Sequence, residues 1–397
     1  MKNTKNYARR SLDGVWIGDC IGNIGQRYAV GDILKALDGG MSKFGGQLNQ
    51  FHNQFQHSDD TEEGIVLYNH LINSGDRNPL IDQDKLAMEF ATRFMTTDPD
   101  GDIFGYGLNT RKILRDIYEG VPWTVANKFL KPKLEGVSSH IDSLVDSLSK
   151  GKDIQTAMHE VNVVLKLQSM ADGNEELQGS CGNGSAMRVA PLGAFIATDW
   201  ARCIQPQQLT SDGFYPFEKK IIVEAMRQAE VTHCHPEGVA GSIAVTLLSF
   251  LITEAVMKEY SHPISYYYTG LLHCTPNGQV WDGIAKARDL PLDMPIGKVI
   301  QILGNGTHVT CQDTVPFCCY MAIKAMSNYP NNKEKIFEQI IIETSMAFGD
   351  VDTNCAIVGG IIANAAPPPD KWIKFCKPME GIIQLDSDGE MCNTEKE

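Results

Sequence analysis

The chain has 397 residues, of which 43% are hydrophobic and 21% charged, so it can bury a large core and is not disordered as a whole. It carries 35 Lys and Arg against 49 Asp and Glu, and this net charge of -14 argues against general binding to nucleic acid. The 11 cysteines include no Cys-x-x-Cys pair, which is typical of a reducing cytosol rather than of a disulfide framework.

Neither a membrane span nor an export signal is expected. The longest uncharged stretch, residues 238–253, is about 16 residues long, whereas a helix needs roughly 20 to cross a bilayer. This stretch is therefore predicted to be a buried helix. No apolar segment with a cleavage site follows the basic N-terminal residues, so the sequence predicts a cytoplasmic protein.

Apolar residues recur at helical spacing along the whole chain, and alternating strand patterns are scarce. The segments with this spacing are residues 64–72, 113–118, 154–167, 221–229, 239–257, 315–326, 336–346 and 356–366. Glycines gather in loops just before several of them. The prediction is one all-α domain over residues 1–366, followed by a peripheral C-terminal tail over residues 367–397.

The first candidate site is an acidic run at Ser58, Asp59 and Asp60, directly before a predicted helix. One interpretation is a helix N-terminus, with Asp60 as N-cap and Glu63 completing a capping box. The other is a cation site, because adjacent carboxylates repel one another unless a cation neutralises them.

A second acidic run, Asp350, Asp352 and Thr353, also leads into a small-residue helix. Alone, such a run is more often a cap or an Asx turn than a metal site. Two hydroxyl-flanked acidic runs that both start helices can instead converge on one centre with two metal ions. Their hard oxygen ligands favour Mg²⁺ or Mn²⁺ over Zn²⁺.

Two glycine loops and one histidine pair are candidates for ligand binding. The loops, residues 101–107 and 179–184, can expose backbone N–H groups to phosphate or ribose oxygens, although each can equally be a plain turn. His233 and His235 flank Cys234 before the uncharged helix, and the alternatives are a zinc site, a helix-entry histidine or a contact to ligand hydroxyls. A nucleophilic cysteine, Cys20 or Cys181, is a further alternative.

The order and wording of these motifs resemble the ADP-ribosylglycohydrolase family. Its members, also called ADP-ribosyl-acceptor hydrolases, include the dinitrogenase-reductase-activating glycohydrolase and the J1 crystallins. The matching segments run from about Asp13 to Ala366 and are GDCIG, SDDTEEGIVLYNHL, FGYGLNTRKIL, GSCGNGSAMRVAPLGAF, THCHPEGVAGSIAV, LGNGTHVTCQDTVPFCCY and FGDVDTNCAIVGGIIANA. The resemblance implies a compact, roughly orthogonal all-α domain with two Mg²⁺ ions in a cleft that binds ADP-ribose.

Carried over to this chain, the resemblance assigns site residues. The metal ligands would be Ser58, Asp59, Asp60, Asp350, Asp352 and Thr353. The residues that contact ADP-ribose would be Gly105, Tyr106, Gly107, Gly182, Asn183, Gly184, Ser185, His233 or His235, and Gly304 with Gly306 on the adenosine side. Tyr106 is expected to pack on a sugar or base.

The resemblance implies a Mg²⁺-dependent hydrolase that frees ADP-ribose from a modified protein side chain. Asp59 or Asp60 would orient the attacking water. Gln26 stands where some members carry a metal-gating glutamate, and an amide cannot transfer a proton. One alternative is therefore a weak or inactive ADP-ribose binder of the crystallin kind. A separate alternative is an immunity protein against an ADP-ribosylating toxin.

Overall fold

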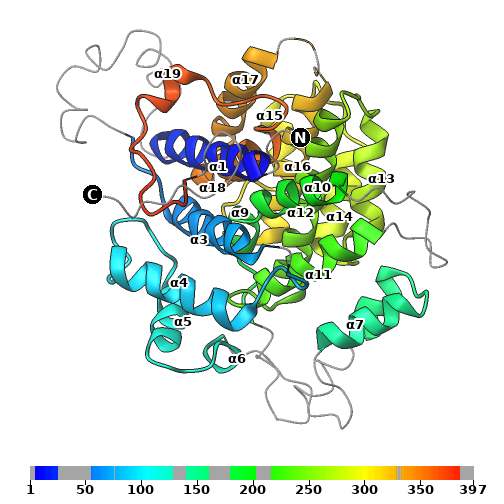
Figure 1. The fold of residues 1–397 in the computed structure, drawn as a ribbon. Helices are drawn as coiled ribbons and strands as arrows, with labels where there is room; N and C mark the ends of the chain where they lie inside the picture. The colour runs from blue at the N-terminus through cyan, green and yellow to red at the C-terminus, as the bar shows by residue number, and fades with distance from the viewer. Residues whose placement is uncertain are drawn as a thin grey trace.

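The computed structural model describes residues 5–25, 55–75, 77–127, 140–160, 179–202, 216–327, 329, 331 and 333–384. Within these ranges all regular structure is helical, apart from two isolated β-bridges that join Phe55 to Cys376 and Gly182 to Thr310. The all-α class expected from the sequence is confirmed (Figure 1).

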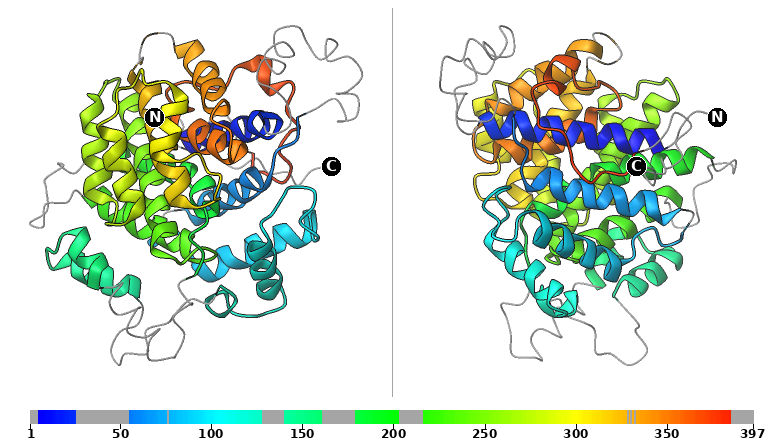
Figure 2. Two further views of the ribbon diagram at one scale, coloured as in Figure 1. Left: turned by 180° about the vertical axis from the view of Figure 1, so that it is seen from behind. Right: turned by 60° about the vertical axis from the view of Figure 1, so that its left-hand side comes forward.

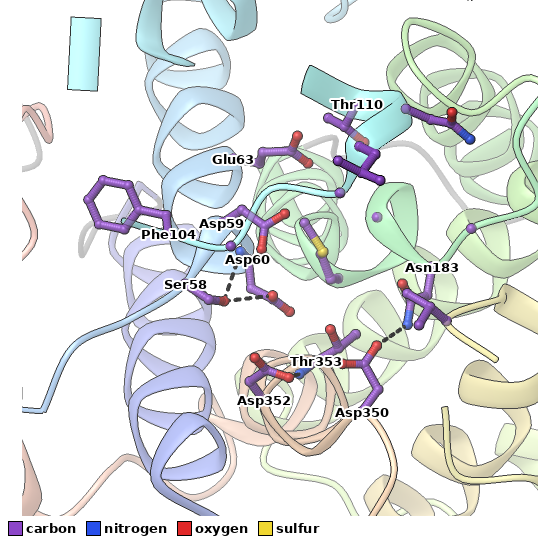
Figure 3. A pocket seen from close by; sticks show the side chains of 18 of the residues that line it. Ser58, Asp59, Asp60, Glu63, Phe104, Thr110, Asn183, Asp350, Asp352 and Thr353 are labelled. Carbon is purple, nitrogen blue, oxygen red and sulfur yellow. Dashed lines mark hydrogen bonds between the residues drawn. The ribbon is translucent and has the colours of Figure 1, made fainter. Parts of the chain in front are cut away.

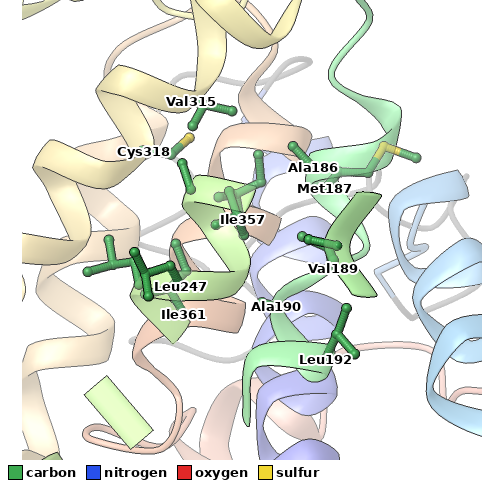
Figure 4. Packing of buried hydrophobic residues seen from close by; sticks show 14 of the residues in the cluster. Ala186, Met187, Val189, Ala190, Leu192, Leu247, Val315, Cys318, Ile357 and Ile361 are labelled. Atoms are coloured by element: carbon green, nitrogen blue, oxygen red, sulfur yellow. The ribbon is translucent and has the colours of Figure 1, made fainter. Parts of the chain in front are cut away.

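Six helices form the centre of the molecule. They are α1 (Lys5–Gly25), α3 (Asp59–Ser74), α10 (Ala190–Arg202), α12 (Pro236–Met257), α16 (Cys311–Ser327) and α18 (Val351–Ile362). α1 packs along α18, with α3 and α10 against α1, while α12 and α16 lie against α18 (Figure 2). Ile357 and Ile361 of α18 share one buried cluster with Leu247 of α12 and Cys318 of α16 (Figure 4).

Shorter helices surround this centre. Their bounds are α4 (Gln83–Thr97), α5 (Leu108–Tyr118), α6 (Trp123–Ala126), α7 (His140–Ser149), α9 (Gly184–Met187), α11 (Pro216–Glu230), α13 (Ile264–Cys274), α14 (Gln279–Arg288), α15 (Ile296–Leu303), α17 (Lys333–Ser345) and α19 (Asp370–Ile373). α4 and α5 pack on each other beside α3, whereas α13 and α14 pack on α12 and α16.

The uncharged stretch at residues 238–253 is the buried helix that the sequence predicts. It lies within α12, which begins with His235 as N-cap and Pro236 in the first turn, where a missing N–H costs nothing. Among the described residues, α12 alone has the length and hydropathy of a membrane span, but 94% of its apolar window is buried inside the protein. A core helix of a soluble protein has the same properties.

Close contact between α1 and α18 depends on glycine. A Cβ atom on Gly18 would lie 2.1 Å from the carbonyl oxygen of Cys355, and one on Gly14 would lie 2.2 Å from that of Gly359. A Cβ on Gly22 would meet the backbone of Asp352 at 2.5 Å. The three glycines are four residues apart, so they share one face of α1 and let the two backbones touch.

The predicted helices lie where the sequence places them, with two corrections. The segment predicted over residues 356–366 belongs to α18, which begins at Val351 and ends at Ile362, and one helix start differs. Ser58, not Asp60, is the N-cap of α3, and its hydroxyl oxygen accepts a hydrogen bond from the Asp60 N–H. Asp60 is already helical. The segment predicted over residues 154–167 is helical from Ile154 to Glu160, and its remainder lies outside the described residues.

The C-terminal segment expected to be peripheral is packed on the body as far as it is described. Trp372 of α19 is fully buried and lies against Phe337 of α17. Farther along, the indole N–H of Trp16 donates to the Lys377 carbonyl at 2.9 Å, and the Ile383 N–H donates to the Asn69 side chain. Residues 367–384 therefore pack on the described helices of the body.

Substitution of Gly18 by alanine tests the contact between α1 and α18. Because the added methyl group would meet backbone atoms that cannot turn aside, Gly18→Ala should lower the free energy of unfolding by about 3 kcal/mol. Gly64→Ala in α3 is the matched control. Its methyl group would meet the flexible Leu12 side chain at 3.1 Å and should be neutral or stabilising by up to about 1 kcal/mol. Urea titrations compare the two, and equal losses would contradict this account.

Candidate active site

The predicted site residues converge on one cavity of about 730 Å³. Its walls come from the starts of α3 and α18, the loop before α5 and the loop before α9 (Figure 3). The predicted residues that line it are Ser58, Asp59, Asp60, Gly105, Gly107, Gly182, Asn183, Gly184, His233, Asp350, Asp352 and Thr353. Segments nearly 300 residues apart in the sequence thus share one surface.

The start of α3 is fixed by Asp19, which the motif analysis did not single out. This fully buried carboxylate on α1 accepts hydrogen bonds from the Ser58 N–H at 2.9 Å and the Thr61 N–H at 3.2 Å. It also accepts one from the Thr61 hydroxyl at 2.5 Å. Asp19 therefore occupies unpaired donors of the α3 N-terminus and aims the acidic run that follows Ser58 at the cavity.

The start of α18 is joined to the glycine loop by Asn183. The side-chain amide of Asn183 donates to Asp350 Oδ2 at 2.6 Å and to the Thr314 hydroxyl at 3.0 Å. Asp352 accepts a hydrogen bond from the Thr353 N–H. In Figure 3 the Asp350 and Asp352 carboxylates lie across the cavity from Asp60.

Burial and mutual repulsion raise the pKa values of four carboxyl groups in this cavity, those of Asp59, Asp60, Asp350 and Asp352. The pKa of Asp60 is raised first by burial and then by the charges of Asp19 and Asp352. The pKa of Asp59 is raised by burial and by Glu63 and Asp352. The charges therefore oppose one another when the cavity holds no cation.

The donor set fits a hard divalent cation. Every predicted ligand offers oxygen, and Asp60 Oδ1 is buried without a hydrogen-bond partner. Among the described residues, no three Asp, Glu, His or Cys side chains already form a ready-made metal cluster. Cation binding would therefore have to draw the facing carboxylates together.

The loop before α5 is held by a second carboxylate that the sequence analysis missed. Asp98, almost fully buried, accepts hydrogen bonds from the N–H groups of Asp102, Ile103 and Phe104. The Phe104 carbonyl in turn accepts from the Asp59 N–H at 2.9 Å. Asp98 thus fixes the loop against the start of α3.

Tyr106 is not placed as the sequence analysis expected. Its ring is only 2% exposed and packs edge-on against Phe94, with 4.9 Å between ring centroids. The neighbours Gly105 and Gly107 line the cavity instead. The aromatic ring therefore anchors the loop in the core, because its large apolar surface is more stable buried there.

His233 lies directly beneath the glycine loop. A Cβ on Gly184 would come within 2.7 Å of His233 Cε1, so only glycine leaves room there. Burial lowers the pKa of His233 to about 3, which keeps the ring neutral. The Thr232 hydroxyl oxygen accepts from Arg188 and lies 2.8 Å from His233 Nδ1, to which the hydroxyl proton can be donated. The assigned tautomer therefore carries its proton on Nε2, beside the loop.

Besides Tyr106, four predicted ligand-binding residues lie outside the cavity lining. Ser185 is buried and donates to the Gly238 carbonyl, and His235 caps α12 by accepting from the Glu237 N–H. Gly304 ends α15, with Asp313 where a Cβ would be. Gly306 lines an adjoining hollow together with Asp350. Gln26 lies outside the described residues.

The zinc alternative and a nucleophilic Cys20 find little support. His233, Cys234 and His235 have separate partners, since Cys234 donates to the Asn127 carbonyl while His235 caps a helix. Burial raises the pKa of Cys234 to about 12. Burial also raises the pKa of Cys20, so neither thiol is an activated nucleophile.

A family model described as ADP-ribosylglycohydrolase matches residues 1–376. The chain belongs to the ADP-ribosylglycohydrolase family. No curated protein gives a significant match. Members of this family are hydrolases that act on ADP-ribosylated substrates, and the match covers every segment that lines the cavity.

This member of the ADP-ribosylglycohydrolase family also contains a buried network behind the cavity. Arg188 is fully buried, and its guanidinium donates to Glu63 Oε2 at 2.8 Å and to the Thr232 hydroxyl at 2.9 Å. Arg188 therefore links His233, through Thr232, to Glu63 on α3. We call the carboxylates at the starts of α3 and α18 the acidic wall. A signal was present in the sequence, because Arg188 is a lone charge within the small and apolar run that follows the glycine loop.

The repulsion between the cavity carboxylates can be tested by the stability of two variants that each remove one negative charge. The folded-state pKa of Asp60 lies above its ordinary value of 3.8. At a pH above both the ordinary and the folded-state pKa, the Asp60 charge therefore lowers the stability of the folded protein. In EDTA at pH 8, Asp60→Asn should raise the free energy of unfolding by about 1 to 3 kcal/mol, with less gain at acid pH. Asp98→Asn should lower it by about 1 to 3 kcal/mol, because the Asp98 carboxylate accepts several N–H groups. Losses in both variants would rule out carboxylate repulsion at Asp60.

Proposed function

We propose that this protein is a metal-dependent hydrolase that removes ADP-ribose from a modified protein side chain. The main support is the facing pair of acidic helix starts in one cavity, with a neutral histidine opposite, in a chain of a glycohydrolase family. The cavity volume lies within the roughly 300 to 1,000 Å³ usual for small-molecule sites. We further propose that the protein acts in the cytoplasm.

Bound Mg²⁺ or Mn²⁺ would supply positive charge for the facing carboxylates and attract the hydroxyl oxygens of the distal ribose. Ser58, Asp59, Asp60, Asp350, Asp352 and Thr353 would hold the two ions.

The residues of the chain would divide the remaining work. The Nε2–H of His233 would donate to a ligand oxygen, and because the ring stays neutral it adds no charge. Asp59 or Asp60 would accept a proton from the water that attacks the anomeric carbon, as that carbon gains oxocarbenium character. The bond from this carbon to the modified side chain would break, and the departing side chain would take up the proton.

The main contribution of the glycine loop before α9 is that it lets a ligand approach His233 closely. The Gly182 N–H donates to the Ser180 hydroxyl, and the Asn183 N–H donates to the Val309 carbonyl, so both donors are engaged within the protein. Glycine at positions 182 and 184 leaves space for a ligand above His233.

Hydrolysis of defined substrates tests the activity. Peptides with arginine-linked or serine-linked ADP-ribose should release ADP-ribose with Mg²⁺ and not with EDTA. Asp352→Asn should reduce turnover at least about 100-fold, whereas Asp289→Asn, at an exposed ion pair outside the cavity, should not.

Three other outcomes would each have a clear meaning. Turnover that survives EDTA would rule out the metal dependence. Binding of ADP-ribose without release from either peptide would favour the alternative of an inactive binder, which Gln26 suggests. Inhibition of an ADP-ribosylating toxin without hydrolysis would favour an immunity protein.

The relative affinities of related nucleotides test whether the acidic wall binds the distal ribose. In Mg²⁺, ADP-ribose should bind more tightly than ADP, AMP or ribose 5-phosphate, because it alone combines a diphosphate with a distal ribose whose hydroxyls reach the acidic wall. Isothermal titration calorimetry measures this difference. Equal affinities for ADP and ADP-ribose would exclude the acidic wall from recognition.

A further inference from the structure

The mouth of the cavity is apolar although its interior is acidic. Five large hydrophobic side chains among the described residues are more than 55% exposed, and four of them gather here. Leu108 (81%), the first residue of α5, and Ile103 (62%), in the loop before α5, line the cavity. Val309 (56%) lines both the cavity and the adjoining hollow, and Phe348 (72%) lines that hollow. We call these four residues the apolar rim.

Two residues of the apolar rim have a strained backbone. Val309 has φ of 54° and Phe348 has φ of 58°, in the left-handed region. A β-branched or bulky side chain rarely adopts this conformation, because its Cβ then crowds the carbonyl oxygen. Glycine or asparagine would adopt it more readily. Strain of this kind tends to mark functional positions.

Hydrogen bonds hold both residues in this conformation. The Val309 carbonyl accepts from the Asn183 N–H at 3.2 Å, and the Val309 N–H donates to Gly306. Beside Phe348, the Asn305 amide donates to the Ala347 carbonyl, and the Asn305 carbonyl accepts from the Asp350 N–H. The contacts that place Asn183 and Asp350 in the cavity therefore also turn two apolar side chains out to solvent.

We propose that the apolar rim docks the polypeptide that carries the ADP-ribosyl group and favours modified residues with apolar neighbours. This inference rests on the proposed function, because a modified side chain that enters the cavity brings its polypeptide across the mouth. Continuity with the cavity is the structural argument: Val309 belongs to both surfaces, and Leu108 and Ile103 line the cavity itself. Burial of exposed apolar surface would supply the affinity.

Two matched peptides test the docking. They carry the same ADP-ribosylated residue, flanked in one by leucine and phenylalanine and in the other by serine and glycine. The wild type should show a KM about tenfold lower for the apolar peptide, with kcat unchanged. Binding of the two peptides provides a readout that does not need hydrolysis. Their dissociation constants are measured in Mg²⁺ with the Asp352→Asn variant, or with the wild type if it does not turn them over.

Variants assign the preference to particular side chains. Phe348→Asn removes the ring but suits the left-handed backbone, so the melting temperature should stay the same or rise. It should abolish the preference for the apolar peptide and leave turnover of a single ADP-ribosylated amino acid unchanged. Leu108→Gln should raise the KM for the apolar peptide. Val125→Gln is the matched control, because Val125 is 63% exposed but lies on α6, outside the cavity lining.

Other results would overturn the proposal in distinguishable ways. Equal KM values for the two peptides in the wild type would contradict it while leaving the proposed hydrolysis intact. Weaker binding of free ADP-ribose in Phe348→Asn would mean that the ring contacts the nucleotide instead. A wild-type dimer that Phe348→Asn dissociates, without a change in peptide preference, would make the rim a contact between copies. Failure to bind either peptide or ADP-ribose would reject both the rim and the proposed function.

Discussion

The close contact between α1 and α18 is the constraint on which the site depends. Gly14, Gly18 and Gly22 let the backbones of the two helices touch, and any larger residue would hold them apart. Asp19 follows Gly18 directly on α1, and Asp352 lies beside Gly22. The glycine face therefore brings carboxylates from the two ends of the chain into one electrostatic environment.

This environment costs stability unless the charges are compensated. Asp19 is compensated within the protein by three donors at the start of α3, and Glu63 by the guanidinium of Arg188. Asp60 and Glu63 each have one buried oxygen without a hydrogen-bond partner, but of the two only Glu63 is paired with a guanidinium. The charge of Asp60 is therefore the less compensated one among the described residues. This difference separates carboxylates that build the site from those that are available to a ligand. The His233 ring is neutral for a related reason, because burial and the nearby Arg188 charge both disfavour a positive charge on it.

The cavity and its mouth have opposite polarity, and the same hydrogen bonds produce both. Asn183 and Asn305 bind the loops that precede α9, α16 and α18 to one another. These bonds turn Asp350 inward and Val309 and Phe348 outward. A small, polar ligand and an apolar polypeptide can therefore contact neighbouring surfaces of one rigid set of loops, with backbone strain stored at the boundary.

The sequence by itself determined the class of fold and most of the cavity, because helical periodicity, glycine loops and acidic runs are local signals. It identified α12 as buried from its lack of charge, and it named both acidic helix starts. Only the tertiary structure decided that Ser58 rather than Asp60 caps α3, because the carboxylate that organises this turn, Asp19, comes from 39 residues earlier. Only the tertiary structure also shows that His233, not His235, lines the cavity and that Tyr106 packs in the core. Which way a side chain points depends on partners distant in sequence, and no local pattern encodes those partners.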